Sequence, residues 1–224
     1  MSPLIPSMLN TTDAIVLSLQ PHSDKAHVLH AYTRTGGRVN YMVYGLGRKH
    51  AIGMYTPFTL LQITADHSPS KPPTLKEAVP LNTNLLTSNP YKSAIALFLS
   101  EVLYHVLRHP MTDEPMFDFI AQAIRELDRC EEPQNFHLQF LVGLAAKLGF
   151  AIEENNPLSS LQTESVQWTV ESSRVGGRLP STRKARQEAL RQLCAYFEEH
   201  VETWESPRSL EILMEVFDYN CHQK

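Results

Sequence analysis

The chain of 224 residues has little cysteine and no long hydrophobic run. Its three cysteines, Cys130, Cys194 and Cys221, are far apart, and an odd, sparse set is a poor disulfide framework. This usage is typical of a reducing compartment. No apolar run approaches the roughly 18–20 residues that span a bilayer, and the start of the chain lacks the basic and apolar regions of a signal peptide. We therefore expect a soluble, cytoplasmic protein.

The common catalytic signatures are also missing. The sequence contains no G-x-S-x-G, GxxxxGK[ST] or HExxH motif, and Gly45-Leu46-Gly47 is followed by Arg48-Lys49 without the third glycine of a dinucleotide site. We therefore expect no enzymatic activity and no cofactor.

A metal site is not expected either, because metal ligation needs three or four suitable side chains at one point. His22, His27 and His30 fall on opposite faces of a strand, so they do not converge. Cys130 with His137 and Cys194 with His200 are isolated pairs.

The net charge of −4 hides an asymmetry about Pro80. Residues 1–80 hold 7 lysines and arginines and 4 aspartates and glutamates, a net of +3, whereas residues 81–224 hold 13 and 20, a net of −7. Five of the ten histidines also lie in the first part. A basic module joined to an acidic one favours a polyanionic ligand for the first.

The first 80 residues have the pattern of strands separated by turns. Short apolar or alternating runs, rich in β-branched and aromatic residues, occur at 14–19, 28–33, 39–44, 57–65 and 74–79. Thr35-Gly36-Gly37 is typical of a hairpin loop. Because a lone sheet of this size would leave its edges exposed, five such strands predict a small closed or nearly closed barrel.

After Pro80 the apolar period changes from 2 to 3.6. We expect five amphipathic helices, beginning near Pro90, at Pro115, at Pro133, after a cap at Ser181, and at Ser206-Pro207. Residues 151–180 lose this pattern, and the alternation around Trp168 predicts a short inserted hairpin. The fold class expected is α+β, with a barrel at 1–80 and a helical domain at 81–224.

Cations gather at the predicted strand ends and loops. Arg34, Arg38, Arg48, Lys49 and His50 lie there, where small barrels meet single-stranded nucleic acid. Four tyrosines that could stack on bases lie near them: Tyr32, Tyr41, Tyr44 and Tyr55. The alternative is that these rings fill the barrel and the arginines only keep it soluble.

A second basic cluster opens the fourth predicted helix. Residues 174–191 contain six cations against the single acid Glu188: Arg174, Arg178, Arg183, Lys184, Arg186 and Arg191. Cations in a first helical turn oppose the helix dipole, which favours an anionic ligand there. The alternative is a surface helix whose basic side pairs with acidic neighbours.

An ordered set of short segments resembles the N-terminal module of the RecO family of bacterial recombination mediators. These segments are Ala14 to Ser18, Ser23 to Leu29, Tyr32 to Gly37, Gly45 to Lys49, and Pro57 to Leu61. The third predicted helix ends in Lys147-Leu148-Gly149-Phe150, which is similar to that family's Leu-Gly-Phe or Leu-Gly-Tyr ending.

The resemblance implies an OB-fold followed by a helical domain, in a nucleoid-associated DNA-repair protein. It implies binding of single- and double-stranded DNA, annealing of complementary strands, and help in loading recombinase onto protein-coated single strands. The implied protein partners are RecR and the acidic C-terminal tail of the single-stranded DNA-binding protein. Many members carry four zinc-binding cysteines after the third helix, but residues 150–180 here contain none, so zinc is not carried over.

Two sets of candidate residues follow. For nucleic acid they are Lys25, Arg34, Arg38, Arg48, Lys49 and His50, and for the partner tail they are Lys147, Arg183, Lys184 and Arg186. Two alternatives remain at this point: another small-barrel protein that binds RNA or DNA, and an adaptor whose barrel binds a peptide.

Overall fold

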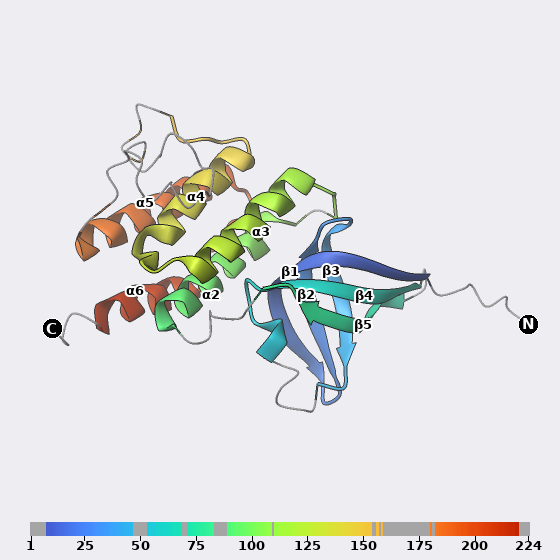
Figure 1. The fold of residues 1–224 in the computed structure, drawn as a ribbon. Helices are drawn as coiled ribbons and strands as arrows, with labels where there is room; N and C mark the ends of the chain where they lie inside the picture. Colours follow the sequence, from blue (N-terminus) through green and yellow to red (C-terminus); the bar gives the residue numbers. More distant parts are fainter. Residues whose placement is uncertain are drawn as a thin grey trace, which may run out of the picture. The chain divides into compact units, whose positions relative to one another are not determined.

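Five strands in the order β1-β2-β3-β5-β4 close into a barrel (Figure 1). The strands are β1 (Met8–Ser23), β2 (Ala26–Thr33), β3 (Gly37–Tyr44), β4 (Leu60–Ser68) and β5 (Lys71–Pro80). Neighbours are antiparallel except β3 and β5, which run parallel with Met42 opposite Thr74. This arrangement confirms the predicted OB-fold barrel.

The computed structural model describes residues 8–46, 53–68, 71–82, 89–108, 110–153, 156, 158, 180 and 182–219. The chain divides into two compact units. The first consists of Met1–Asn84 with Leu107–Ile124, and the second of Leu85–Val106 with Arg125–Lys224. The predicted hairpin around Trp168 lies outside the described residues.

The barrel core is formed by the side chains at every second position along the strands. Side chains of one parity point inward because successive residues of a strand face opposite sides of the sheet. The inward set includes Ala14, Val16, Leu29, Ala31, Tyr41, Val43, Leu61, Ile63, Ala65 and Leu75.

Strand β1 is longer than the predicted 14–19 run. Its polar first part pairs with β4, and its end, including Pro21, pairs with β2. Proline cannot donate to a ladder, and a register shift between Pro21 and Ser23 accommodates it. Residues 20–23 therefore belong to the strand, and the turn itself is Asp24-Lys25.

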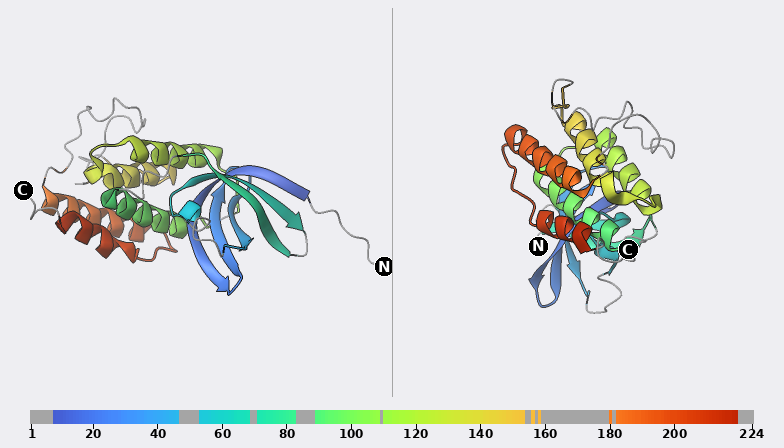
Figure 2. Two further views of the ribbon diagram at one scale, coloured as in Figure 1. Left: turned by 60° about the horizontal axis from the view of Figure 1, so that its bottom comes forward. Right: turned by 90° about the vertical axis from the view of Figure 1, so that its left-hand side faces the viewer.

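Five helices occur among the described residues after the barrel, as expected. They are α2 (Pro90–Val106), α3 (Glu114–Arg129), α4 (Phe136–Lys147), α5 (Arg183–His200) and α6 (Ser209–Tyr219). Within the second unit α2 packs on α6 and α4 packs on α5, which Figure 2 shows from two further sides. On α2 the apolar residues Ile95, Phe98, Leu99 and Val102, which recur at helical spacing, are each 0% exposed, and Val106 is half-buried.

Side chains fix the starts of α5 and α6. The cap of α5 is Thr182, whose hydroxyl accepts a hydrogen bond from the Ala185 amide, so the prediction of Ser181 was wrong by one residue. At α6, the Glu101 carboxylate of α2 accepts hydrogen bonds from the backbone amides of Arg208 and Ser209 and from the Ser209 hydroxyl. Burial by itself would raise the pKa of Glu101, but these hydrogen bonds and nearby His105 lower it overall.

Candidate nucleic-acid interface and basic pocket

The outer surface of the barrel differs in charge from one side to the other. On β4 the inward residues are Leu61, Ile63 and Ala65, so Gln62, Thr64 and Asp66 point outward. Their cross-strand partners on β1 and β5 share that outer face and include Asp13 and Glu77. Three of the four acids of residues 1–80 therefore lie on this face, and the fourth, Asp24, lies in the β1–β2 turn.

The outer face of β2 and β3 contains no acidic residue, because neither strand has an aspartate or glutamate. Arg38 and Tyr44 point outward from β3, since Tyr41 and Val43 on the same strand point inward. Lys25 is exposed in the turn that leads into β2. This basic face is defined here by Lys25, Arg38 and Tyr44.

His30 and Asn40 occupy the middle of the basic face. Nδ1 of His30 lies 2.7 Å from Oδ1 of Asn40. Burial lowers the pKa of His30, the hydrogen bond with Asn40 partly raises it, and the charge of Arg38 lowers it further. The net shift is downward, so His30 adds no positive charge to the face near neutral pH.

The structure places Arg34 in a packing role within the first unit. Its Nη2 lies 2.7 Å from Oδ1 of Asp118 and its Nε lies 3.8 Å from Oδ2 of Asp13. The guanidinium also stands 4.5 Å from the centre of the Phe117 ring. Arg34 therefore holds residues 107–124 against the barrel, at the opposite end of β2 from Lys25.

Three of the four tyrosines are packing residues. Tyr41 and Tyr55 are 2% and 7% exposed inside the barrel, and Tyr32 is 3% exposed and stacked on Phe117 at 6.3 Å. Burial raises the pKa values of Tyr32 and Tyr41 to about 12, with Asp113 contributing at Tyr32. Tyr44 differs, because 58% of it is exposed. Residues 48–50, with the predicted contacts Arg48, Lys49 and His50, lie outside the described residues.

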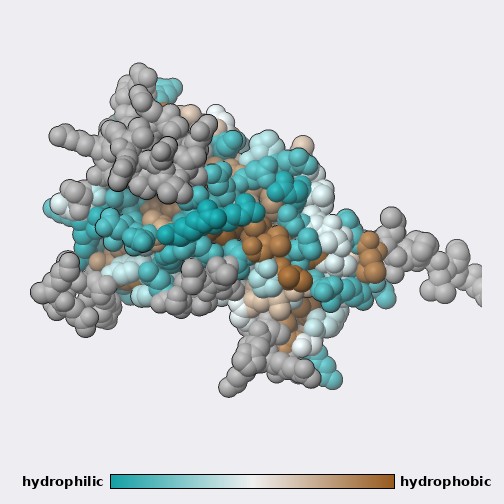
Figure 3. Space-filling model, viewed as in Figure 1, coloured by the Kyte–Doolittle hydropathy of each residue, from teal (hydrophilic) through white to brown (hydrophobic). Residues whose placement is uncertain are grey.

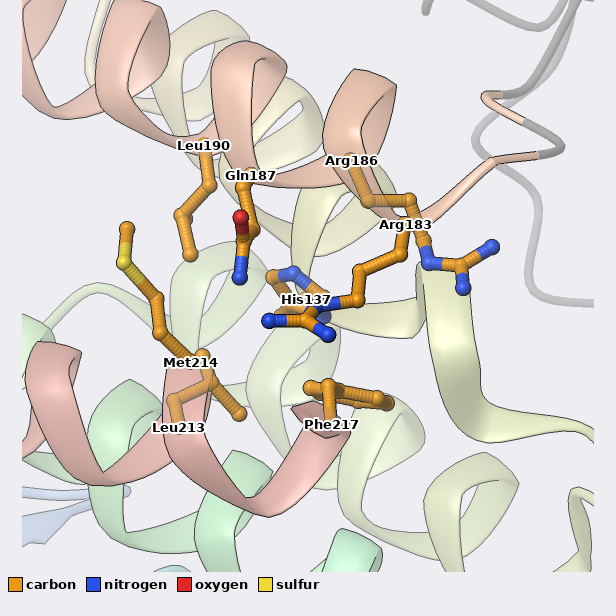
Figure 4. Close-up of a pocket in the computed structure, with 8 residues that line it drawn as sticks. All are labelled: His137, Arg183, Arg186, Gln187, Leu190, Leu213, Met214 and Phe217. Atoms are coloured by element: carbon orange, nitrogen blue, oxygen red, sulfur yellow. The ribbon is translucent and has the colours of Figure 1, made fainter. Parts of the chain in front are cut away.

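A pocket opens in the second unit between α4, α5 and α6 (Figure 4). It is a shallow hollow with a cavity volume of about 10 Å³, room for about one water molecule. Its walls combine apolar side chains with two arginines: His137, Arg183, Arg186, Gln187, Leu190, Leu213, Met214 and Phe217. The side chain of Arg183 reaches toward His137 and Phe217, whereas that of Arg186 extends to one side (Figure 4).

Only part of the predicted partner set meets at this pocket. Arg183 and Arg186 line it, whereas Lys147 and Lys184 are exposed and do not. Arg191 lies 4.0 Å from Glu188, and Arg174 and Arg178 are outside the described residues. The sequence patterns did not associate His137 or Phe217 with this cluster, because both lie on other helices and meet α5 only when α4, α5 and α6 pack together.

The environment of His137 is unusual for a histidine. Its side chain is 2% exposed, and its Nδ1 has no hydrogen-bond partner among the described residues. Burial lowers its pKa to about 3, with a further contribution from the charge of Arg186. The ring is therefore neutral in the pH range where proteins are normally studied.

The cysteines of the described chain have no metal-binding partners. No group of three or more potential ligands gathers among the described residues. Cys194 is a buried core residue of α5, and burial raises its pKa to about 12. None of the described helices has the length and apolar character needed to cross a membrane.

The closed barrel followed by helices defines an OB-fold protein with a helical second unit. Two family models match it: "Recombination protein O N terminal" over residues 8–84 and "Recombination protein O C terminal" over residues 87–173. The chain belongs to the RecO family of DNA repair proteins.

Curated relatives named DNA repair protein RecO span much of the chain. The protein of Christiangramia forsetii is 29% identical over 94% of this chain and 100% of its own length. That of Phocaeicola vulgatus is 37% identical over 63% of this chain and 61% of its own length. That of Flavobacterium johnsoniae is 26% identical over 92% and 98%.

Proposed function

We propose that this protein binds single- and double-stranded DNA through the basic face of its barrel. In this role it anneals complementary strands and helps to load recombinase onto protein-coated single strands. The observation that carries the proposal is the division of charge around the barrel. A polyanion is attracted by Lys25 and Arg38 on the side that has no acidic residue. The other side carries Asp13, Asp66 and Glu77, of which Asp13 and Asp66 are paired with Arg34 and Lys76. The role requires no catalytic step.

Binding by phosphate contacts has a measurable signature, because each contact releases counterions. Replacing Lys25 by Ala should weaken binding and lower the magnitude of the slope of log K against log salt by about 0.7 on single strands. The double change Arg48→Ala, Lys49→Ala tests the segment after β3 in the same way. The measurement is fluorescence anisotropy over a salt series.

The control for this experiment is Arg129→Ala, which removes an exposed cation of the helical unit. It should leave the salt slope unchanged. If the Lys25→Ala variant keeps both the wild-type affinity and slope, the basic face is not the DNA site. The same result for the Arg48/Lys49 variant would exclude the segment after β3. An annealing assay with protein-coated strands then separates a recombination mediator from a simple DNA-binding protein.

We further propose that the pocket between α4, α5 and α6 binds the acidic, phenylalanine-ended tail of the single-stranded DNA-binding protein. Such a tail needs an apolar site for its ring and cations for its carboxylates. Leu190, Leu213 and Phe217 offer the first, and Arg183 and Arg186 the second. RecR is a proposed partner on family grounds, and no residue is assigned to it.

Charge reversal at the pocket should weaken tail binding. We expect the double change Arg183→Glu, Arg186→Glu to lower the affinity for a labelled acidic peptide ending in Phe by at least about tenfold, because two charge-assisted contacts are lost. Anisotropy titration measures the effect, and DNA binding should not change.

Lys184→Glu is the matched control, because Lys184 lies beside Arg183 on α5 but does not line the pocket. An equal loss in Lys184→Glu and in the double variant would indicate general attraction to α5 rather than the pocket. Lys147→Glu tests the end of α4 in the same way. If the wild-type protein does not bind the peptide, this partner is wrongly assigned.

A further inference from the structure

Tyr44 is an exposed aromatic residue on a barrel whose other described tyrosines are buried. It is the last residue of β3, and its outward direction follows from the inward packing of Tyr41 and Val43. With 58% of its surface exposed, it contributes little to the barrel core. The ring therefore has no evident role in stabilising the fold.

Other exposed apolar side chains of the barrel lie in different surroundings. Leu9 and Val79 are 66% and 47% exposed, but they stand opposite Asp66 and Gln62 on the acidic side. Figure 3 shows apolar residues over the strand-rich part of one face of the molecule. Tyr44 is distinct because it combines an exposed ring with a basic surrounding.

The neighbours of Tyr44 are small or cationic. Directly opposite on β2 is Ala26, which is small and 3% exposed, and Lys25 precedes it in the turn. On the other side, Met42, two residues before Tyr44, pairs with Thr74 of the parallel strand β5.

We propose that Tyr44 stacks against a base of single-stranded DNA while Lys25 contacts the neighbouring phosphates. The inference rests on the proposed DNA binding and adds a residue that contacts bases rather than phosphates. The occupant is a single strand because paired bases in a duplex have no open face for a ring. It is a polyanion rather than a peptide without charge because β2 and β3 carry no acid that would repel phosphates.

The test compares two oligonucleotides of equal length, one of thymidines and one of abasic sites, by fluorescence anisotropy. Wild-type protein should bind the thymidine strand more tightly. Tyr44→Ala should bind that strand about tenfold more weakly, as expected for loss of one stacked base. Its affinity for the abasic strand and its salt slope should stay at wild-type values, because the phosphate contacts are intact.

Two further variants separate stacking from general apolar contact. Tyr44→Phe keeps the ring face and should bind like wild type, whereas Tyr44→Leu keeps the bulk without the π face and should behave like Tyr44→Ala. Val79→Ala on the acidic side is the matched control and should have no effect.

The outcomes distinguish this inference from the function on which it rests. If wild-type protein binds neither strand, the DNA-binding proposal fails. If wild type binds and both Tyr44→Ala and Tyr44→Leu keep the wild-type ratio of affinities for the two strands, the stacking role of Tyr44 is overturned and DNA binding stands. A loss in Tyr44→Phe equal to that in Tyr44→Ala would also overturn it.

Discussion

Acidification from pH 7 to pH 5 is expected to destabilise the helical unit by about 2 kcal/mol through His137 alone, since each unit of pKa difference is worth about 1.4 kcal/mol. The folded-state pKa is about 3, below the model-compound value of 6.5. Above pH 6.5 the ring is neutral in both states and has no effect. As the pH falls below 6.5, only the unfolded state takes up the proton, so stability is lost progressively until about pH 3.

Urea unfolding at pH 7 and pH 5 measures this loss. Both tryptophans of the chain, Trp168 and Trp204, belong to the helical unit, so their fluorescence reports on it. His137→Leu removes the titrating group at similar volume, and the difference in the free energy of unfolding between the two pH values should shrink by about 2 kcal/mol.

His22→Gln is the control, because His22 is exposed in β1. It should leave the pH dependence as in wild type. The interval stops at pH 5 because carboxylates with lowered pKa values, such as Glu101, release their stabilisation only as the pH falls further. If His137→Leu retains the full wild-type loss between pH 7 and pH 5, the histidine is not buried in the neutral form.

Gly37→Ala is expected to destabilise the barrel unit by about 2–4 kcal/mol, through backbone strain and a steric clash together. Gly37 begins β3 with φ +60°, a conformation that side chains disfavour. A Cβ at this position would stand 2.4 Å from the carbonyl oxygen of Met111 and 2.8 Å from its nitrogen. These are backbone atoms, so the clash is relieved only by moving residues 107–124 away from the barrel.

Two specific contacts hold residues 107–124 against the barrel and would be disturbed by this substitution. The Thr112 hydroxyl donates a hydrogen bond to the Thr35 carbonyl at 3.0 Å, and Arg34 reaches Asp118. The loss should therefore appear both in the free energy of unfolding, followed by circular dichroism, and in faster hydrogen exchange of the amides around the β2–β3 turn.

Gly45→Ala separates the two causes. Gly45 has φ +77°, but a Cβ there would have no heavy atom within 4 Å. It should cost only the backbone term, about 1 kcal/mol. Equal losses in the two variants would show that the close approach of Met111 does not matter, and that strain alone accounts for the effect.

Particular residues show how far the sequence could lead toward the site. Alternation placed β2 and β3 correctly, and counting charges found the excess of cations in the barrel. Counting charges could not show that Arg34 is engaged in packing whereas Lys25 is exposed. Arg34 is engaged because Asp118, 84 residues later, returns to meet it, and local spacing contains no information about such a contact.

The tyrosines and the pocket also show which features the sequence predicts and which only the structure reveals. Four rings near cations left base stacking and core packing equally possible, and burial assigned three to packing and left Tyr44 exposed. At the pocket, the basic start of α5 was visible in the sequence. His137 and Phe217 were not, because they join Arg183 only when α4, α5 and α6 pack together.

The sequence by itself determined the class of fold and the family. Apolar residues recur with a period of 2 in strands and 3.6 in helices because of the side-chain directions within each element. These periods are present in any chain that buries one face of each strand and helix. Only the tertiary structure decided the strand order, the acidic and basic sides of the barrel, the attachment of residues 107–124 and the pocket. These features depend on pairs of residues far apart in the chain, whose meeting is set by packing and register.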